Sequence, residues 1–385
     1  MKKSILKKFT VYFVLAIIIL SVLMPKSNAA TEYGDLNERW FYIKNSYTGH
    51  YMDVYYGVAQ GGTNVQQQEY NGSGAQKWYL ANRGNGDYMI CSEVGATDAG
   101  EGKINLNFSL DVDNGINENG TQIHLWNTSV DGVTQTFSFR KLTNNTFSIW
   151  TRCSNYTKVA SLSDNLCDNG INIHQWEYSN HSHDEWILEP ADAYVTMGVQ
   201  YAKANYSKYL DAYPDLREYT TNSILNSTNF VSQCLLAGGQ VHQNDGWYMK
   251  RKNTNYHEIL NTSQLNNSWS YSNSWINAQA FRNNFNTSDR EVYYCKGQDI
   301  LNNPGIVWNR DIVTGDVVQM ADYNSYGIGS SIYTYYITGY GTETVNGNSY
   351  SSYNLTYQSP SKLNKNLLEL AKLYPNYYFV FYDFT

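Results

Sequence analysis

Three segments in the first half of the chain repeat polar and aromatic side chains at matched spacing. Each segment starts with a polar residue. A glutamine or tryptophan follows 15 residues later, and a glutamine or aspartate follows 8 or 9 residues after that. The three sets are Asp53, Gln68 and Gln76; Asp111, Trp126 and Gln135; and Ser161, Trp176 and Asp184. Aromatic residues make up 15% of the chain, and such rings are typical of strands and of sugar-facing surfaces. The matched intervals indicate an internal repeat rather than coincidence.

The repeated positions are expected on short strands. Each segment alternates apolar and polar residues between turns rich in Gly and Asn, such as 60–64 and Asn119-Gly120. One such unit cannot bury its apolar face alone, whereas three units around a pseudo-threefold axis can close a barrel and its cap. The sequence therefore predicts an all-β domain of three units over residues 35–190.

The three units resemble those of the ricin-type β-trefoil lectin domain. The resemblance rests on LDV-like triplets, VQxW-like quartets and QxW-like triplets, which are 52–54, 65–68 and 76–78 in the first unit. It implies an all-β trefoil with a shallow sugar site in each unit. In such a site the acid accepts hydrogen bonds from sugar hydroxyls, and the quartet aromatic stacks on the apolar face of the sugar ring. The residues that close the last triplets are implied to be core residues, namely Trp78, Phe137 and Trp186.

Transferred position by position, the resemblance implies a set of carbohydrate-binding candidates. They are Asp53, Gln66 and Gln76 in the first unit, Asp111, His124, Trp126 and Gln135 in the second, and His174 and Trp176 in the third. In the first unit Gln68 replaces the aromatic, and in the third Ser161 replaces the acid and Asp184 the Gln. An alternative is that Asp53 and Asp111 only cap turns. We expect the second site to bind best and the third least, with avidity supplying useful affinity.

The residue pattern changes after Glu189-Pro190. Apolar residues recur at steps of 4, 3, 4 and 4 from Val195 to Leu210, which predicts a helix. Further helices are predicted over 227–237, ended by Gly238-Gly239, around 275–285 and over 362–373. Strands are predicted over 316–320, 331–338, 350–357 and 377–384. Helices followed by an antiparallel sheet predict an α+β domain over residues 191–385.

Several segments of this half resemble the amidase domain found in secreted bacterial proteins. The most specific is the run STNFVSQCLLAGG at 227–239, and the others are 274–279, 315–319 and 337–340. The resemblance implies a papain-like fold. In such a site a cysteine at a helix N-terminus has a lowered pKa, and a histidine on a neighbouring strand takes its proton. A third polar residue orients that histidine.

This sequence departs from that family at the decisive positions. Asn226-Ser227 replaces the family's Asp-Cys pair, and Tyr333 and Gln358 align with its strand histidine and a second polar position. A serine without a base is a poor nucleophile, and a tyrosine with a pKa near 10 is not a base at pH 7. We therefore predict degenerate catalytic positions, with Ser227 as a helix N-cap and Cys234 as a buried structural thiol.

The sequence leaves more than one function open. The favoured one is a secreted carbohydrate-binding protein with a non-catalytic amidase-like domain, whose partners are cell-surface or cell-wall glycans. The alternative is an active amidase or peptidase that uses Ser227 on cell-wall or extracellular amides and is delivered by the lectin domain. A host-directed toxin component is compatible with the layout, but no residue argues for it. No cofactor or metal is expected, because the chain has no CxxC pair and 181–184 is typical of a solvated loop.

The first 29 residues are predicted to be a secretory signal peptide. Lysines precede an apolar run from Phe9 to Met24, and Ser27-Asn28-Ala29 supplies small residues for cleavage. An uncleaved membrane anchor is the alternative, although the run is shorter than the roughly 20 residues that span a bilayer. We expect an extracellular protein with no membrane span after cleavage.

Removal of residues 1–29 leaves 22 basic and 34 acidic residues, a net charge of −12. A chain that acidic lacks the basic surface of a nucleic-acid-binding protein, so we exclude nucleic acid as a partner. The five cysteines leave at least one thiol unpaired. Cys153 and Cys167 are 14 residues apart and are close enough in sequence to form a disulfide.

Overall fold

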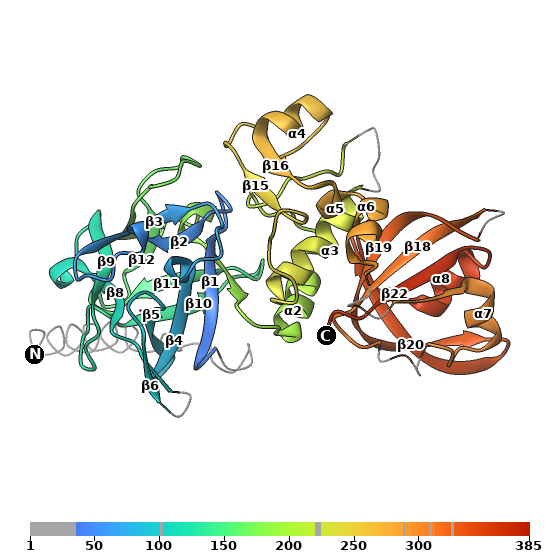
Figure 1. Ribbon diagram of the computed structural model, residues 1–385, viewed down its shortest axis with the longest axis horizontal. Helices are drawn as coiled ribbons and strands as arrows, with labels where there is room; N and C mark the ends of the chain where they lie inside the picture. The colour runs from blue at the N-terminus through green and yellow to red at the C-terminus, as the bar shows by residue number, and fades with distance from the viewer. Residues whose placement is uncertain are drawn as a thin grey trace, which may run out of the picture.

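The computed structural model describes residues 36–100, 103–219, 225–287, 290, 292–307, 310, 312–324 and 327–385. The predicted signal peptide lies outside these residues. The described chain forms an all-β region followed by a region of helices and strands (Figure 1). No helix within the described ranges is long and apolar enough to cross a membrane.

The first region is a closed barrel capped by three hairpins. The barrel strands are β1 (Arg39–Asn45), β4 (Lys77–Gly84), β5 (Asp87–Ser92), β10 (Phe137–Lys141), β11 (Phe147–Thr151) and β14 (Trp186–Pro190). They pair antiparallel in that order, and β14 returns to pair with β1. Closure leaves the barrel without free edges, which is how such sheets avoid pairing with other chains.

The hairpins tie the three units together. They are β2 (Tyr51–Val54) with β3 (Thr63–Gln68), β8 (Phe108–Val112) with β9 (Thr121–Asn127), and β12 (Lys158–Leu162) with β13 (Ile173–Glu177). Strand β9 pairs with both β3 and β13. A further small hairpin joins β6 (Thr97–Gly100) to β7 (Lys103–Asn105). The region is β-trefoil-like, as the sequence predicted.

The trefoil core has matching side chains in its three units. Trp78, Phe137 and Trp186 are all fully buried, which confirms the prediction that they are core residues. Trp78 Nε1 donates to the carbonyl of Met52 at 3.0 Å, and Trp186 Nε1 donates to the carbonyl of Ala160 at 2.9 Å. Each of these rings therefore anchors the strand that carries the first motif of its own unit.

The second region packs helices on both faces of an antiparallel sheet. In the sheet, β17 (Val292–Lys296), β22 (Tyr378–Tyr382), β18 (Val317–Asn324), β19 (Gly327–Val345), β20 (Asn348–Tyr357) and β21 (Lys362–Asn366) pair in that order. The helices are α2 (Val195–Asn205), α3 (Leu225–Ala237), α4 (Thr262–Ser268), α5 (Asn273–Ile276), α6 (Ala278–Phe285), α7 (Gly297–Asn302) and α8 (Leu367–Leu373). A short ladder joins β15 (Met249–Arg251) to β16 (Trp269–Tyr271).

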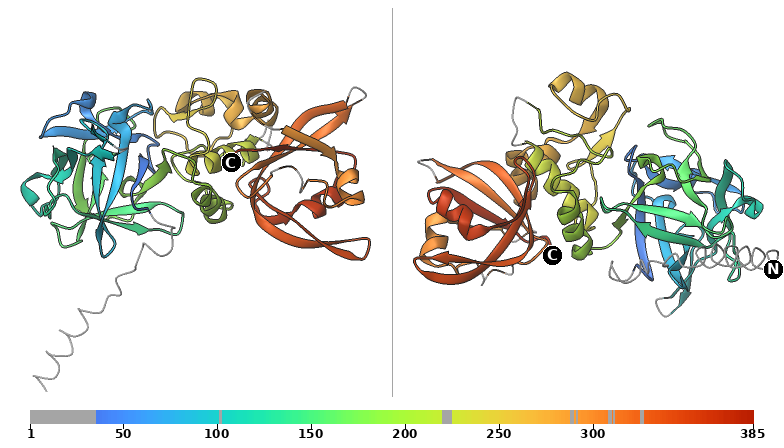
Figure 2. Two further views of the ribbon diagram at one scale, coloured as in Figure 1. Left: turned by 60° about the horizontal axis from the view of Figure 1, so that its bottom comes forward. Right: turned by 180° about the vertical axis from the view of Figure 1, so that it is seen from behind.

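Strand alternation divides this region into two apolar cores. Val317, Tyr336 and Val380 face the core shared with α2, α3 and α6. Their neighbours along the strands, such as Val318 and Tyr335, face the core shared with α7 and α8. Helix α8 accordingly lies within the curve of the sheet, and α3 lies on the side toward the trefoil (Figure 2).

Two helix predictions in this half were wrong in part. Residues 362–366 form strand β21 instead of the first turn of a helix, and α8 begins only at Leu367. Asn366 causes the change, because its side chain accepts a hydrogen bond from the backbone N–H of Leu368 and caps the helix there. The helix expected around 275–285 is split at Asn277, whose side chain caps α6 by accepting from Ala280 N–H at 3.0 Å.

A buried polar junction joins the two regions. Within the first region, Lys44 Nζ lies 3.3 Å from Glu189 Oε1, and both side chains are buried. Lys44 Nζ also donates to the hydroxyl of Tyr213 in the second region at 3.0 Å. Burial lowers the pKa of Lys44, and the nearby Glu189 carboxylate opposes that shift. Arg251 crosses the boundary as well, since its guanidinium donates to the carbonyl of Tyr47 at 2.5 Å, while it also donates to the carbonyl of Asp211 of its own region at 2.7 Å. The boundary is therefore a packed interface rather than a linker.

All five cysteines are free thiols, so the disulfide considered for Cys153 and Cys167 is absent. Cys153 Sγ contacts Gln175 Oε1 at 3.8 Å, whereas Cys167 lies in a loop that Gln67 holds through the carbonyls of residues 166 and 168. Cys234 is fully buried on α3, which confirms its prediction as a buried thiol, and burial raises its pKa well above the usual value.

Candidate functional site

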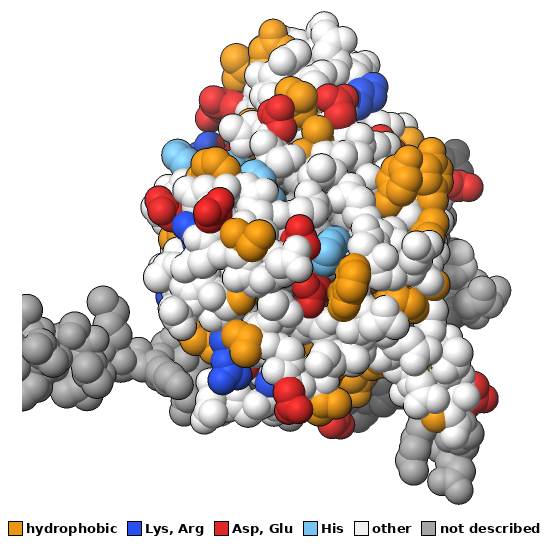
Figure 3. Space-filling view, turned by 90° about the vertical axis from the view of Figure 1, so that its left-hand side faces the viewer, with side chains coloured by type: hydrophobic (Ala, Val, Ile, Leu, Met, Phe, Trp, Pro, Cys, Tyr) orange, Lys and Arg blue, Asp and Glu red, His pale blue; other side chains and the backbone are white. Residues whose placement is uncertain are grey.

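The trefoil carries one hollow in each unit, at equivalent positions. Their volumes are about 740, 300 and 360 Å³ in the first, second and third units. Each hollow lies between a hairpin, the turn after its first strand and the loop after its second strand. The end of the molecule formed by the trefoil carries acidic, histidine and apolar side chains scattered among uncharged polar groups (Figure 3).

The second unit has the most complete set of predicted residues. Asp111 on β8 is buried and pairs across the hairpin with His124 on β9. Asp111 Oδ2 accepts from Thr134 Oγ1 at 2.7 Å, and Oδ1 lies 3.6 Å from His124 Nε2. Trp126 remains 46% exposed and stacks on His124, with ring centroids 5.4 Å apart. The hollow therefore has a carboxylate at its base and an exposed aromatic face at its rim.

The exposed rings of Trp126 and Trp176 pack against glycines of the preceding unit. A Cβ added at Gly62 would lie 3.6 Å from the ring of Trp126, and one added at Gly120 would lie 3.6 Å from Trp176. Both glycines have positive φ, +87° and +85°, which a residue with a side chain rarely adopts. Each ring is thus held between the histidine of its own unit and a loop of its neighbour.

Gln135 and Gln76 hold the loops that border their hollows. Gln135 Oε1 accepts from Ser129 N–H at 2.7 Å, and its Nε2 donates to the Asn127 carbonyl at 2.9 Å. Gln76 makes the matching pair with Asn71 N–H and the Glu69 carbonyl, both at 2.9 Å. This bracing role was not anticipated from the sequence, because it depends on backbone groups of a loop without a motif.

Asp184 braces the third loop in the same way. Its Oδ2 accepts from the backbone N–H of Ser179 at 2.7 Å and from the hydroxyl of the same residue at 2.6 Å. The shorter Asp therefore replaces Gln as the brace, although the sequence presented it as a departure from the pattern.

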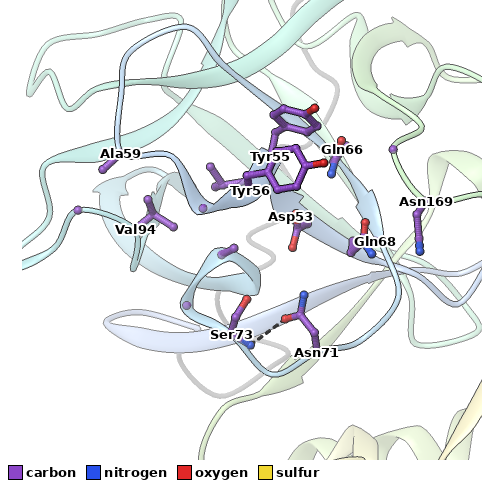
Figure 4. Close-up of a pocket in the computed structure, with 16 residues that line it drawn as sticks. Asp53, Tyr55, Tyr56, Ala59, Gln66, Gln68, Asn71, Ser73, Val94 and Asn169 are labelled. Atoms are coloured by element: carbon purple, nitrogen blue, oxygen red, sulfur yellow. Dashed lines mark hydrogen bonds between the residues drawn. The ribbon is translucent and has the colours of Figure 1, made fainter.

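The first unit supplies aromatic rings from a different element. Asp53 on β2 pairs with Gln66 on β3, and Gln68 occupies the position of the missing aromatic. Tyr55 and Tyr56, in the 3-10 turn Tyr55–Gly57, line the same hollow and stand beside Asp53 (Figure 4). Tyr56 is 84% exposed. The sequence feature that could have indicated these rings is Tyr-Tyr-Gly at 55–57, directly after the first motif. The second unit has Asp-Asn-Gly at the equivalent positions.

The carboxyl of Asp53 has a raised pKa. Burial raises the pKa of its carboxyl to about 6, and hydrogen bonds with Gln66 and Gln76 oppose the shift. The carboxylate is therefore ionised at neutral pH and protonated in mildly acidic solution.

The third unit has Ser161 in place of the acid on its first hairpin strand but keeps the stacked rings. His174 and Trp176 have centroids 5.1 Å apart, and Trp176 is exposed. Burial lowers the pKa of His174, which favours the neutral ring. Ser161 Oγ donates to the carbonyl of Leu162 at 3.2 Å, and the exposed Asp164 lines the hollow from the following turn. A carboxylate is thus present, at the rim instead of the base.

Comparisons with known proteins find a family model that matches a part of each region. Residues 32–126 match the family model "Ricin-type beta-trefoil lectin domain-like". Residues 193–370 match the model "Putative amidase domain". No curated protein matches the chain. We call the two regions the lectin-like and the amidase-like domain.

Solved structures match the lectin-like domain. The designed threefold-symmetric protein ThreeFoil is 23% identical, over 39% of this chain and 96% of that one, with a TM-score of 0.34. An exo-beta-1,3-galactanase from Clostridium thermocellum is 23% identical over 39% of this chain and 30% of that one, with a TM-score of 0.34. The Macrolepiota procera ricin B-like lectin, solved with lactose, is 16% identical over 40% of this chain and 95% of that one, with a TM-score of 0.30.

Ser227 lies inside the amidase-like domain and not at a helix cap. Helix α3 begins at Leu225, so Ser227 is its third residue and the N-cap prediction was wrong. The side chain is 0% exposed, and its Oγ accepts from the backbone N–H of Thr334 at 3.3 Å.

The strand residue beside Ser227 is Thr334 and not Tyr333. Thr334 Oγ1 lies 2.9 Å from Thr228 Oγ1, so this side chain faces α3. Tyr333 points to the other face of β19, where it stacks with Tyr335 and packs against the α7 and α8 core. Because neighbouring residues of a strand face opposite sides, Tyr333 does not face Ser227.

Gln358 belongs to a buried amide network at the start of α3. Its Oε1 accepts from Asn226 Nδ2 at 2.9 Å, and its Nε2 donates to the carbonyls of Asn205 at 2.7 Å and Lys208 at 2.9 Å. The two histidines of this domain bond to backbone carbonyls near the domain boundary, His242 to Ala191 at 3.0 Å and His257 to Leu210 at 3.1 Å. Over the described ranges, no cluster of three or more His, Cys, Asp or Glu is arranged to hold a metal ion.

Proposed function

We propose that this protein is a secreted carbohydrate-binding protein with a non-catalytic amidase-like domain. The observation that carries the proposal is the hollow of the second unit, which the buried carboxylate of Asp111 and the exposed ring of Trp126 both line. A pyranose has one face rich in C–H groups, which suits an aromatic ring, and a polar rim, which suits a carboxylate. The partners in this proposal are cell-surface or cell-wall glycans.

A glycan array probed with the full chain tests sugar binding. We expect hits that weaken about fivefold in Trp126→Ala, since loss of one stacked ring costs about 1 kcal/mol, and that weaken further in Asp111→Ala. Trp150→Ala is the matched control, because Trp150 is a partly exposed tryptophan of the same domain outside the three hollows. An array without hits, or hits that survive both site substitutions, would contradict the proposal.

The non-catalytic role is supported by what surrounds Ser227. Its hydroxyl is buried and accepts from the backbone N–H of Thr334, and the adjacent Asn226 bonds to the amide of Gln358. Neither a threonine hydroxyl nor an amide is a base at neutral pH. In this proposal the domain keeps a papain-like order of helix and sheet while lacking the reactive groups.

The second candidate function is an active amidase, favoured by the family match over 193–370. Peptidoglycan fragments incubated with the full chain should release no free amine above background. Release that disappears in Ser227→Ala would establish the enzyme reading instead.

A further inference from the structure

A cleft lies between the two domains, next to the first unit of the lectin-like domain. Its volume is about 650 Å³, within the size range of small-molecule sites. One wall is the loop Glu69–Asn71 after β3, and the others are the segment 243–248 and the β15–β16 ladder. Both domains therefore contribute side chains to one concave surface.

The lining of the cleft suits an uncharged polyhydroxylated ligand. Tyr248 offers an aromatic ring, and Asn244 and Ser270 offer hydrogen-bonding groups. The charges balance, with two acids, Glu69 and Asp245, against two lysines, 250 and 252. Lys250 Nζ is paired with Glu69 Oε2 at 3.3 Å. A phosphate or another anion would find no excess positive charge here.

Asn71 connects this cleft with the hollow of Asp53. It lines both, and it is exposed. Its backbone N–H donates to Gln76 Oε1 at 2.9 Å, and its Oδ1 accepts from Ser73 N–H at 2.9 Å, as Figure 4 shows for the second bond. A ligand in the Asp53 hollow can therefore continue past Asn71 toward Tyr248.

The walls of the cleft are held in place before a ligand arrives. Gln243 is buried, its Nε2 donates to Tyr51 Oη at 3.1 Å, and its Oε1 accepts from Met249 N–H at 3.1 Å. Tyr70 packs against Tyr42 and Tyr51, with centroids 5.2 and 5.1 Å apart. Because these contacts cross the boundary or support it, binding requires little further ordering of the walls.

We infer that one neutral oligosaccharide binds across the domain boundary. One end occupies the Asp53 hollow, the chain passes Asn71, and later sugars lie in the cleft against Tyr248 of the amidase-like domain. The inference rests on the proposed carbohydrate binding and assigns to the amidase-like domain a part of the binding surface. The ligand is thus a chain longer than the mono- or disaccharide that one trefoil hollow holds.

Binding of oligosaccharides of graded length tests the inference. The probes are cello-, chito- and β-1,4-galacto-oligosaccharides, from disaccharide to octasaccharide, titrated calorimetrically into the full chain with Asp111→Ala and Trp176→Ala in place to silence the other units. For at least one series we expect the affinity to rise about tenfold with length. Tyr248→Ala should remove this rise and leave the disaccharide affinity unchanged. Tyr294→Ala, an exposed tyrosine on β17 away from the cleft, is the matched control and should keep the rise.

The outcomes separate the two proposals. Binding that does not depend on length, or a length dependence that Tyr248→Ala leaves intact, overturns the inference while carbohydrate binding stands. If neither the variant chain nor the wild-type chain binds an oligosaccharide of any length, the inference and the proposed carbohydrate binding are both overturned. Circular dichroism and the unchanged disaccharide affinity show that Tyr248→Ala is folded, and Tyr248→Phe should restore the length dependence.

Discussion

Lys44 and Glu189 lie 145 positions apart in the chain and form an ion pair where the two domains meet. The atoms Lys44 Nζ and Glu189 Oε1 are 3.3 Å apart, and Glu189 Oε2 accepts from Tyr51 Oη at 2.7 Å. Tyr213 of the amidase-like domain completes the network, because its hydroxyl accepts from Lys44 at 3.0 Å. Tyr51 Oη also accepts from Gln243 Nε2 at 3.1 Å, so the network reaches a residue that lines the cleft between the domains.

Removal of Lys44 should destabilise the whole chain. In Lys44→Met the Glu189 carboxylate stays buried without its cation, and such losses cost about 3–5 kcal/mol in the free energy of unfolding. Urea unfolding followed by tryptophan fluorescence measures the change. Lys372→Met is the control, since its exposed pair with Glu343 is worth at most about 1 kcal/mol. Equal effects of the two substitutions would contradict the structural role of the junction.

Sugar binding by the first unit should depend on pH. The pKa of Asp53 is raised to about 6, so the carboxylate that accepts hydroxyl hydrogen bonds is lost as the pH falls through 6. In a chain carrying Asp111→Ala and Trp176→Ala, affinity should decline between about pH 7 and pH 5. Affinity that stays constant over this range would show that Asp53 does not contact the sugar as an anion.

The same shift predicts that Asp53 costs stability. A carboxyl whose folded pKa lies above its unfolded value destabilises the fold once the pH exceeds the unfolded value, and the cost is complete above the folded pKa. Asp53→Asn should therefore raise the free energy of unfolding by about 1–3 kcal/mol near pH 8 and have little effect near pH 3. Urea unfolding at the two pH values measures this, and a gain of the same size at both would refute it.

Tyr56 should contribute to binding at the expense of stability. It has φ of +50°, in the left-handed region, and its ring is almost fully exposed. Tyr56→Gly should stabilise the fold by about 1 kcal/mol and weaken binding in the first unit about fivefold. Tyr56→Phe retains the ring and should bind like the wild type. Unchanged binding in Tyr56→Gly would remove this residue from the site.

Export should remove the first 29 residues. Intact-mass measurement of the protein recovered from the medium of a secreting host should give a chain that begins at Ala30. Full-length protein that remains with the membrane fraction would instead support the uncleaved anchor.

The sequence was informative where one repeat constrained many positions together. The 15-residue spacing placed Asp111, His124 and Trp126 on one hairpin, and the closing triplets located the core residues Trp78 and Trp186. These positions are predictable because three units must satisfy the same geometry.

Other features depended on contacts that no local pattern specifies. The tyrosines of the first hollow lie on a turn, outside the motifs, and one has a backbone conformation that its residue type disfavours. Thr334, and not its neighbour Tyr333, lies beside Ser227, because strand register decides which face each side chain takes. The junction of Lys44 with Glu189 joins distant parts of the chain, and the cleft beside it requires both domains.

The most direct test of the central claim is calorimetric titration of the best array glycan into the wild type and into Asp111→Ala/Trp126→Ala. We expect saturable binding whose affinity or stoichiometry falls in the double variant, with the unfolding transition of the domain preserved. Identical isotherms for the two proteins would contradict the claim that this hollow binds sugar.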